Sequence, residues 1–153
     1  MTEDSPVFID TNVLVYYEII EAPLHIVARR TLDEYSTRET ACWISRQVPR
    51  EFIATLTRPQ TFTQPLHIGI VLERAAHFEH RFQIAEDGPS VTRNLHDLLR
   101  QVPCGGKQVH DANIVATMLA HGIPRILTHN LADFTRFEDV IGVLPLEEQT
   151  HVP

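Results

Sequence analysis

Apolar and polar positions along the 153-residue chain form two kinds of segment. Short apolar runs bounded by polar or turn residues are typical of buried strands, and apolar residues three to four positions apart are typical of helices. The pattern predicts strands at 7–10, 41–45, 83–87, 125–129 and 143–146. It predicts helices at 12–20, 24–36, 48–56, 66–82, 91–102 and 108–121, with a turn or short helix at 131–139.

Strands that alternate with helices predict an α/β fold with a mostly parallel sheet. No repeat, low-complexity stretch or linker interrupts the pattern, and 43% of the residues are hydrophobic, so residues 1–153 are predicted to form a single domain. There is no long apolar segment and the chain begins acidic (MTEDSP). We therefore expect a cytoplasmic protein with neither a signal peptide nor a membrane span.

The charge balance permits a nucleic-acid partner without indicating one. A net charge of −7 argues against broad, nonspecific nucleic-acid binding, which needs a basic surface. Twelve of the 13 basic residues are Arg, and Arg suits bidentate phosphate contacts better than Lys. A genome biased toward Arg codons gives the same count. Cys42 and Cys104 form no CxxC pair and fit structural thiols in a reducing compartment.

Four acidic residues stand where predicted strands end or helices begin. Asp10 ends the first strand, Asp133 follows the strand at 125–129, Glu51 lies near the start of the helix at 48–56, and Asp111 lies in the first turn of 108–121. Each alone is explained by a turn, a helix cap or the helix dipole. Because strand carboxyl ends and the following helix N-termini share one edge of a parallel α/β sheet, we expect the four to converge there.

Clustered carboxylates repel one another and raise one another's pKa unless a cation joins them. All-oxygen ligands favour a hard divalent ion, Mg²⁺ or Mn²⁺, over Zn²⁺. Such an ion polarises a phosphoryl oxygen and lowers the pKa of a bound water, and phosphodiester hydrolysis needs both effects. The residues therefore favour a metal-dependent nuclease in which the bound cation restores attraction for phosphate locally.

Four stretches of the sequence resemble the PIN domain and, within it, the VapC-like ribonuclease toxins of toxin–antitoxin systems. They occur in family order over residues 8–134 and read FIDTNVLV, ISRQVPREF, GGKQVHDANIVAT and ILTHNLADF. The resemblance implies a three-layer α/β/α sandwich with a short, mostly parallel central sheet and an acidic Mg²⁺ or Mn²⁺ pocket. It also implies endonucleolytic cleavage of RNA, a cognate antitoxin protein and a homodimer.

By the same resemblance, three acids match the family's core acids and are predicted to be catalytic and to hold the metal: Asp10, Glu51 and Asp111. The fourth acidic position of the family falls on Asn130, which carries no charge, and Asp133, the later acid, is predicted to be catalytic as well. Either Asp133 contributes through water or only one metal is firmly held. Hydrogen-bonding residues of the pocket are predicted to be Thr11, Asn12, Thr128 and Asn130.

Other polar residues have a functional and a structural interpretation. Arg46 and Arg50, beside Glu51, are candidates for RNA phosphate contacts, and equally for pairing with nearby acids. His110 adjoins Asp111, but neighbours on a helix point about 100° apart, so we predict a partly buried structural histidine. Trp43 is predicted to lie in the core rather than to stack on bases.

Two alternatives to a nuclease remain. Asn130 motivates a non-catalytic PIN-like module that binds RNA or protein, because the loss of one acid weakens metal affinity. A phosphoacceptor receiver domain also has an Asp at a strand end. It needs paired acids after the first strand and a lysine after a late strand, whereas Lys107, the only lysine, precedes Asp111. The receiver interpretation is therefore disfavoured.

Overall fold

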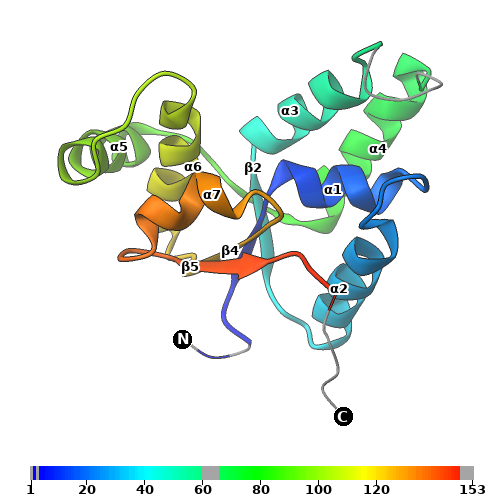
Figure 1. Cartoon of the computed structure of the whole chain (residues 1–153), viewed down its shortest axis with the longest axis horizontal. Coiled ribbons are helices and arrows are strands. Elements are labelled where there is room, and N and C mark those ends of the chain that lie inside the picture. The colour runs from blue at the N-terminus through cyan, green and yellow to red at the C-terminus, as the bar shows by residue number, and fades with distance from the viewer. Residues whose placement is uncertain (1, 3, 60–65, 149–153) are drawn as a thin grey trace.

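A central sheet lies between two layers of helices in the computed structural model of the chain (Figure 1). The structure describes residues 2, 4–59 and 66–148. All strand pairs in this sheet are parallel, and the strand order is β3-β2-β1-β4-β5. The strands are β1 (Val7–Ile9), β2 (Cys42–Ser45), β3 (Gln83–Ala85), β4 (Arg125–Thr128) and β5 (Gly142–Pro145).

The helices cover both faces of the sheet. They are α1 (Thr11–Glu18), α2 (His25–Thr37), α3 (Gln47–Leu56), α4 (Ile68–Arg81), α5 (Pro89–Gln101), α6 (Gln108–His121) and α7 (Leu131–Phe134), which continues into a 3₁₀ turn, η1 (Thr135–Phe137). Figure 1 shows α1–α4 on one side and α5–α7 on the other. Right-handed crossovers require this arrangement, because the chain steps outward from β1 to β3 and then back to β4 and β5.

The predicted α/β/α sandwich is confirmed, and the sheet is fully rather than mostly parallel over the described strands. No boundary shifts by more than two residues; for example, the strand predicted at 83–87 ends at Ala85, and the helix predicted at 91–102 begins at Pro89. Proline is favoured in the first helical turn, where its missing N–H costs nothing. Gly122, in the left-handed region at φ 66°, ends α6 as glycine commonly does.

The chain order of the strands reverses between β1 and β4. These two strands are hydrogen-bonded neighbours, yet the segments that follow them cover opposite faces of the sheet. Open α/β sheets bind ligands at the carboxyl ends of the strands beside such a switch point. Asp10 follows β1 directly and Asn130 lies two residues beyond β4, so both stand at this place. None of the helices in the described ranges is long and apolar enough to cross a bilayer.

Candidate active site

Four carboxylates come from four different segments, and each is fixed by a buried neighbour. Asp10 follows β1, Glu51 is the fifth residue of α3, Asp111 lies in the first turn of α6, and Asp133 is in α7. The adjoining residues with exposed fractions of 1% or less are Ile9, Phe52, Ala112 and Phe134. Each acid belongs to a different segment, and the burial of its neighbour fixes the position of its backbone.

Asp10 is buried and is the N-cap residue of α1. Its carboxylate accepts hydrogen bonds from the Thr11 backbone N–H (2.8 Å), from Asn12 Nδ2 (2.9 Å) and from Thr128 Oγ1 (2.7 Å). Burial raises the pKa of Asp10 above its usual value, although these bonds lower it, and the nearby charge of Glu51 raises it further. The structure thus shows the cap role, and the metal-ligand role remains compatible with it because a carboxylate oxygen has more than one lone pair.

The Asn12 side chain connects the segment after β1 to the segment after β4. Its amide donates to Asp10 Oδ2 and also lies 3.3 Å from Thr128 Oγ1, and its Oδ1 accepts from the His129 backbone N–H at 2.9 Å. Thr128 Oγ1 in turn accepts from the Asn130 backbone N–H at 3.0 Å. The connection after β1 is therefore bonded to the connection after β4, and neither can shift without disturbing Asp10.

Glu51 is held from two sides. Thr11 Oγ1 donates to its Oε2 at 3.0 Å, and Gln47 Nε2 donates to its Oε1 at 2.7 Å. Gln47 Nε2 also lies 3.5 Å from the His110 carbonyl oxygen, which links α3 to α6. Sequence reasoning missed Gln47. Its position four residues before Glu51 was the available signal, because side chains at i and i+4 are neighbours on a helix.

The charges of the other three acids act on the Asp111 carboxyl group. Its pKa is raised from 3.8 to about 6, first by burial and then by the charges of Asp133, Asp10 and Glu51, in that order, while Arg136 lowers it. Like charges raise a carboxyl pKa when they are close. This carboxyl is therefore where the four acids act on one another, and Asp133 has the largest effect among the three charges.

The raised pKa of Asp111 predicts a stability effect in metal-free protein. Between pH 3.8 and about 6 the folded state binds more protons than the unfolded state, so stability falls as pH rises through this window. Asp111→Asn is expected to stabilise the protein at pH 7 in EDTA by about 1 kcal/mol, after solvent screening of a partly exposed carboxyl. Urea denaturation measures this difference.

The gain should vanish at pH 4, where Asp111 is protonated in the folded wild type. Asp97→Asn removes the same charge from the exposed Asp97–Arg100 pair on α5, 2.8 Å apart, and should give no gain. A wild type as stable as Asp111→Asn at pH 7 would show that the Asp111 carboxylate carries no penalty.

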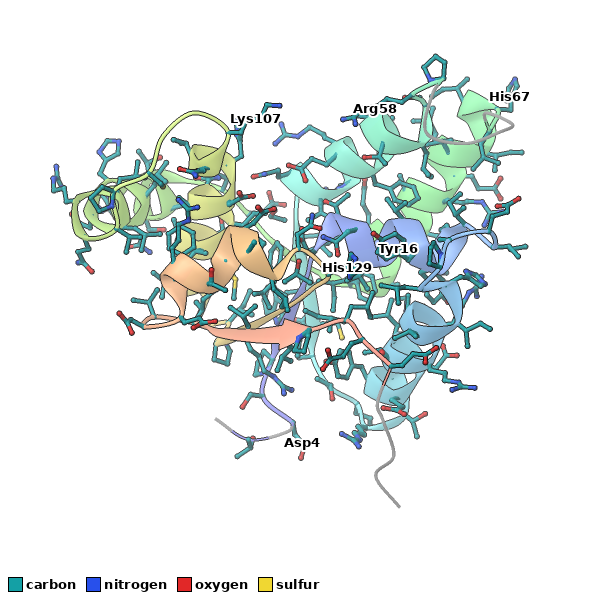
Figure 2. All side chains as sticks on the ribbon, in the orientation of Figure 1. Asp4, Tyr16, Arg58, His67, Lys107 and His129 are labelled. Atoms are coloured by element: carbon teal, nitrogen blue, oxygen red, sulfur yellow. The ribbon has the colours of Figure 1, made fainter. Side chains whose placement is uncertain are left out.

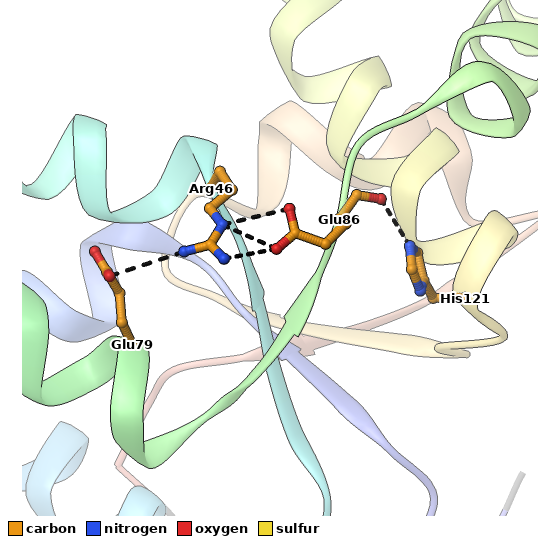
Figure 3. Close-up of polar contacts among 4 residues, drawn as sticks. All are labelled: Arg46, Glu79, Glu86 and His121. Atoms are coloured by element: carbon orange, nitrogen blue, oxygen red, sulfur yellow. Dashed lines mark hydrogen bonds and ion pairs between the residues drawn. The ribbon is translucent and has the colours of Figure 1, made fainter.

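Arg46 pairs with acids, the second of its two interpretations (Figure 3). Its guanidinium donates to Glu86 through Nη2 at 2.6 Å and Nε at 3.1 Å, and Nη1 lies 3.8 Å from Glu79. The hydrogen bonds from Arg46, and to a smaller extent its charge, lower the pKa of Glu86 in return. His121 Nε2 lies 2.9 Å from the Glu86 carbonyl oxygen, so the group also contacts the end of α6. An RNA contact by Arg46 would have to compete with Glu86.

The predictions for the remaining candidate residues have different outcomes. Arg50 is exposed on α3. His110 is exposed as well, so the prediction of a partly buried histidine is wrong: it lies two positions, about 200° around the helix, from Ala112, which faces the core. Trp43 is half-buried and packs against the core, as predicted. Asn130 is exposed and its backbone, not its side chain, bonds to Thr128.

The family model of the PIN domain matches residues 7–140. The chain belongs to the PIN domain family. It is 26% identical over 136 residues to ribonuclease VapC48 of Mycobacterium tuberculosis, which covers 86% of this chain and 91% of that protein.

Solved structures show the same PIN fold. VapBC2 of Rickettsia felis, bound to a DNA fragment from its promoter, contains a chain that is 15% identical and superposes with a TM-score of 0.65 over 92% of this chain and 98% of that one. A toxin–antitoxin complex from Klebsiella pneumoniae contains a chain that is 18% identical, with a TM-score of 0.64 over 93% and 98%.

The acids that act on Asp111 carry oxygen donors of the kind that a hard divalent ion prefers. Across residues 2, 4–59 and 66–148, no three acidic, histidine or cysteine side chains stand together at the distances of ligands to one ion. The mutual effect of four carboxylates on the pKa of Asp111 nevertheless fits a hard divalent ion, which a cluster of this charge favours.

Proposed function

We propose that this PIN-domain protein is an Mg²⁺- or Mn²⁺-dependent endoribonuclease that hydrolyses RNA phosphodiester bonds, and that it is the toxin of a toxin–antitoxin pair. The observation that supports this most directly is the raised pKa of Asp111, whose causes include all three other acids of the pocket. Metal-binding clusters of acids are where such mutual effects are expected.

In this proposal the acids bind the metal, and their polar neighbours hold the acids in position. Asp10, Glu51 and Asp111 hold the metal, and Asp133 supports the metal through water or as a further ligand. Thr11 and Gln47 fix the Glu51 carboxylate by their hydrogen bonds at 3.0 and 2.7 Å. The pocket residues that keep Asp10 in place from both connections are Asn12 and Thr128, with the backbone of Asn130.

When bound, the ion would polarise a phosphoryl oxygen and lower the pKa of a water molecule. In the hydrolysis a bond forms from the water oxygen to phosphorus, and the bond from phosphorus to the 3′ oxygen breaks. The 3′ oxygen takes up a proton, so the products are a 3′ hydroxyl and a 5′ phosphate on the downstream fragment. The pocket side chains orient the reacting phosphate and carry no covalent intermediate.

The proposed partners are RNA as substrate and a cognate antitoxin protein, and we expect a homodimer that acts in the cytoplasm. A chain of similar fold occurs in the toxin–antitoxin complex of Klebsiella pneumoniae. Ile68 and Leu72, one helical turn apart on α4, have exposed fractions of 48% and 49%. Exposed apolar side chains at this spacing suit a protein partner.

Expression of the chain alone tests the proposal. We expect growth arrest of the host, and we expect the purified protein to cut cellular RNA in Mg²⁺ or Mn²⁺ and leave 5′-phosphate ends. End-specific ligation of the fragments measures the ends. Unimpaired growth and uncut RNA, together with retained RNA or protein binding, would instead favour the non-catalytic PIN-like module.

A further inference from the structure

Tyr16 and His129 form an aromatic pair, and Figure 2 shows the two labelled residues side by side. Their ring centroids are 5.5 Å apart and the ring planes meet at 78°, an edge-to-face contact. His129 is exposed and Tyr16 is partly buried on α1. Edge-to-face contacts between aromatic rings are favourable, so the pair restricts the orientation of the exposed His129 ring.

Both members of the pair are connected to residues that bond to Asp10, His129 through its backbone and Tyr16 through α1. His129 directly follows Thr128, and its N–H donates to Asn12 Oδ1 at 2.9 Å. Tyr16 lies four residues after Asn12 on α1, which puts both on the same helix face. Asn12 and Thr128 both donate to Asp10 Oδ2. The His129 backbone is thus bonded to a side chain that itself bonds to Asp10, and Tyr16 lies one helical turn beyond that side chain.

We propose that the Tyr16–His129 pair is a stacking platform for the base of an RNA nucleotide next to the phosphate that is cleaved. The proposal rests on the proposed ribonuclease function. A base can stack on a protein ring only when it is not stacked and paired in a duplex, so the platform acts on a nucleotide that is already unpaired.

Three features of the pair suit this role. Every base has a π-face, so stacking needs no particular sequence. The His129 ring is exposed but already oriented by Tyr16, so less conformational entropy is lost when a base stacks on it. The chain has a net charge of −7, so a general basic surface does not hold the RNA phosphates. Contacts to bases therefore contribute a larger share of the RNA-binding free energy.

The test compares two probes in Ca²⁺: a short fluorescent single-stranded oligouridylate and the same backbone with abasic riboses. Fluorescence anisotropy gives the two dissociation constants. The wild type is expected to bind the oligouridylate about tenfold more tightly than the abasic probe, as base–aromatic stacking predicts. His129→Ala and Tyr16→Ala should each bring this ratio close to one, and the double variant should add little, because Tyr16 acts by orienting His129.

Matched variants separate stacking from other roles. His80→Ala removes an exposed histidine of α4 and should keep the tenfold ratio. His129→Phe and Tyr16→Phe keep a ring and should keep it as well. The hydrogen bond from His25 Nδ1 to the Tyr16 carbonyl oxygen (2.8 Å) uses the backbone, so it survives in the Tyr16 variants.

Two results would overturn the stacking platform without contradicting the proposed nuclease. In the first, the wild type cuts RNA but binds both probes with equal affinity. In the second, His129→Ala keeps the tenfold ratio of the two dissociation constants. Loss of the ratio in His129→Phe would mean that binding depends on the imidazole rather than on an aromatic face, and it would overturn the platform as well. A wild type that neither binds nor cuts RNA in Mg²⁺ or Mn²⁺ overturns the proposed function and the platform with it.

Discussion

Replacement of Asp10 by Asn is expected to slow RNA cleavage about a thousandfold or more without unfolding the protein. An Asn keeps the shape of the side chain and can still accept the Thr11 N–H bond of 2.8 Å, but it brings no charge to the metal. A bound divalent ion contributes several kcal/mol to stabilising the transition state, and each 1.36 kcal/mol is a factor of about ten in rate. The rate constant for cutting a labelled RNA, with thermal unfolding measured beside it, checks both parts.

Asp97→Asn is the matched control, because it makes the same chemical change on the exposed surface of α5. It should cut RNA at the wild-type rate. Because burial raises the pKa of Asp10, its carboxylate is disfavoured in the metal-free protein. Relief of this cost offsets the loss of the acceptor for Asn12 Nδ2, so Asp10→Asn should remain folded and melt cooperatively. Cleavage by Asp10→Asn at more than about a tenth of the wild-type rate would mean that Asp10 is not a metal ligand.

The fold was predictable because each element depends on local pattern. The helix at 108–121 was predicted with both ends correct, since Gly122 fixes its end. Strand order was not predictable, because the pairing of Val7 with Arg125 joins residues that no local pattern connects. Similarly, the partner of Arg46 is Glu86, which comes from the connection after β3.

Within the candidate site, the sequence predicted which acids to consider but not how they are held. Gln47 carries no charge and belongs to no acidic pattern, yet its amide fixes Glu51 at 2.7 Å. Burial of His110 was predicted wrongly, because the angle between helix neighbours excludes a shared direction but does not say which side meets solvent. The choice between Asn130 and Asp133 also lay outside the pattern, since it depends on which side chain comes near the other acids in space; the charge of Asp133 raises the pKa of Asp111.

Removal of divalent ions is expected to abolish cleavage and to lower the melting temperature. A ligand that binds only the folded state stabilises it by about 2.7 kcal/mol at a concentration of 100 Kd. For a chain of this size, such a change corresponds to a melting temperature about 5–10 °C higher with saturating Mn²⁺ than with EDTA. Differential scanning calorimetry gives this difference, and addition of Mg²⁺ or Mn²⁺ after EDTA should restore cleavage.

The same measurement decides which residue completes the pocket. Asp133 has the largest effect of the three charges on the pKa of Asp111, whereas Asn130 is uncharged and exposed. Asp111→Asn should remove the Mn²⁺-induced shift, Asp133→Asn should reduce it, and Asn130→Ala should leave it nearly unchanged. A shift that survives Asp133→Asn but falls in Asn130→Ala would assign the fourth position to Asn130. A wild type with no shift in either ion would mean that these acids repel one another without a metal to bind, and the nuclease proposal would be wrong.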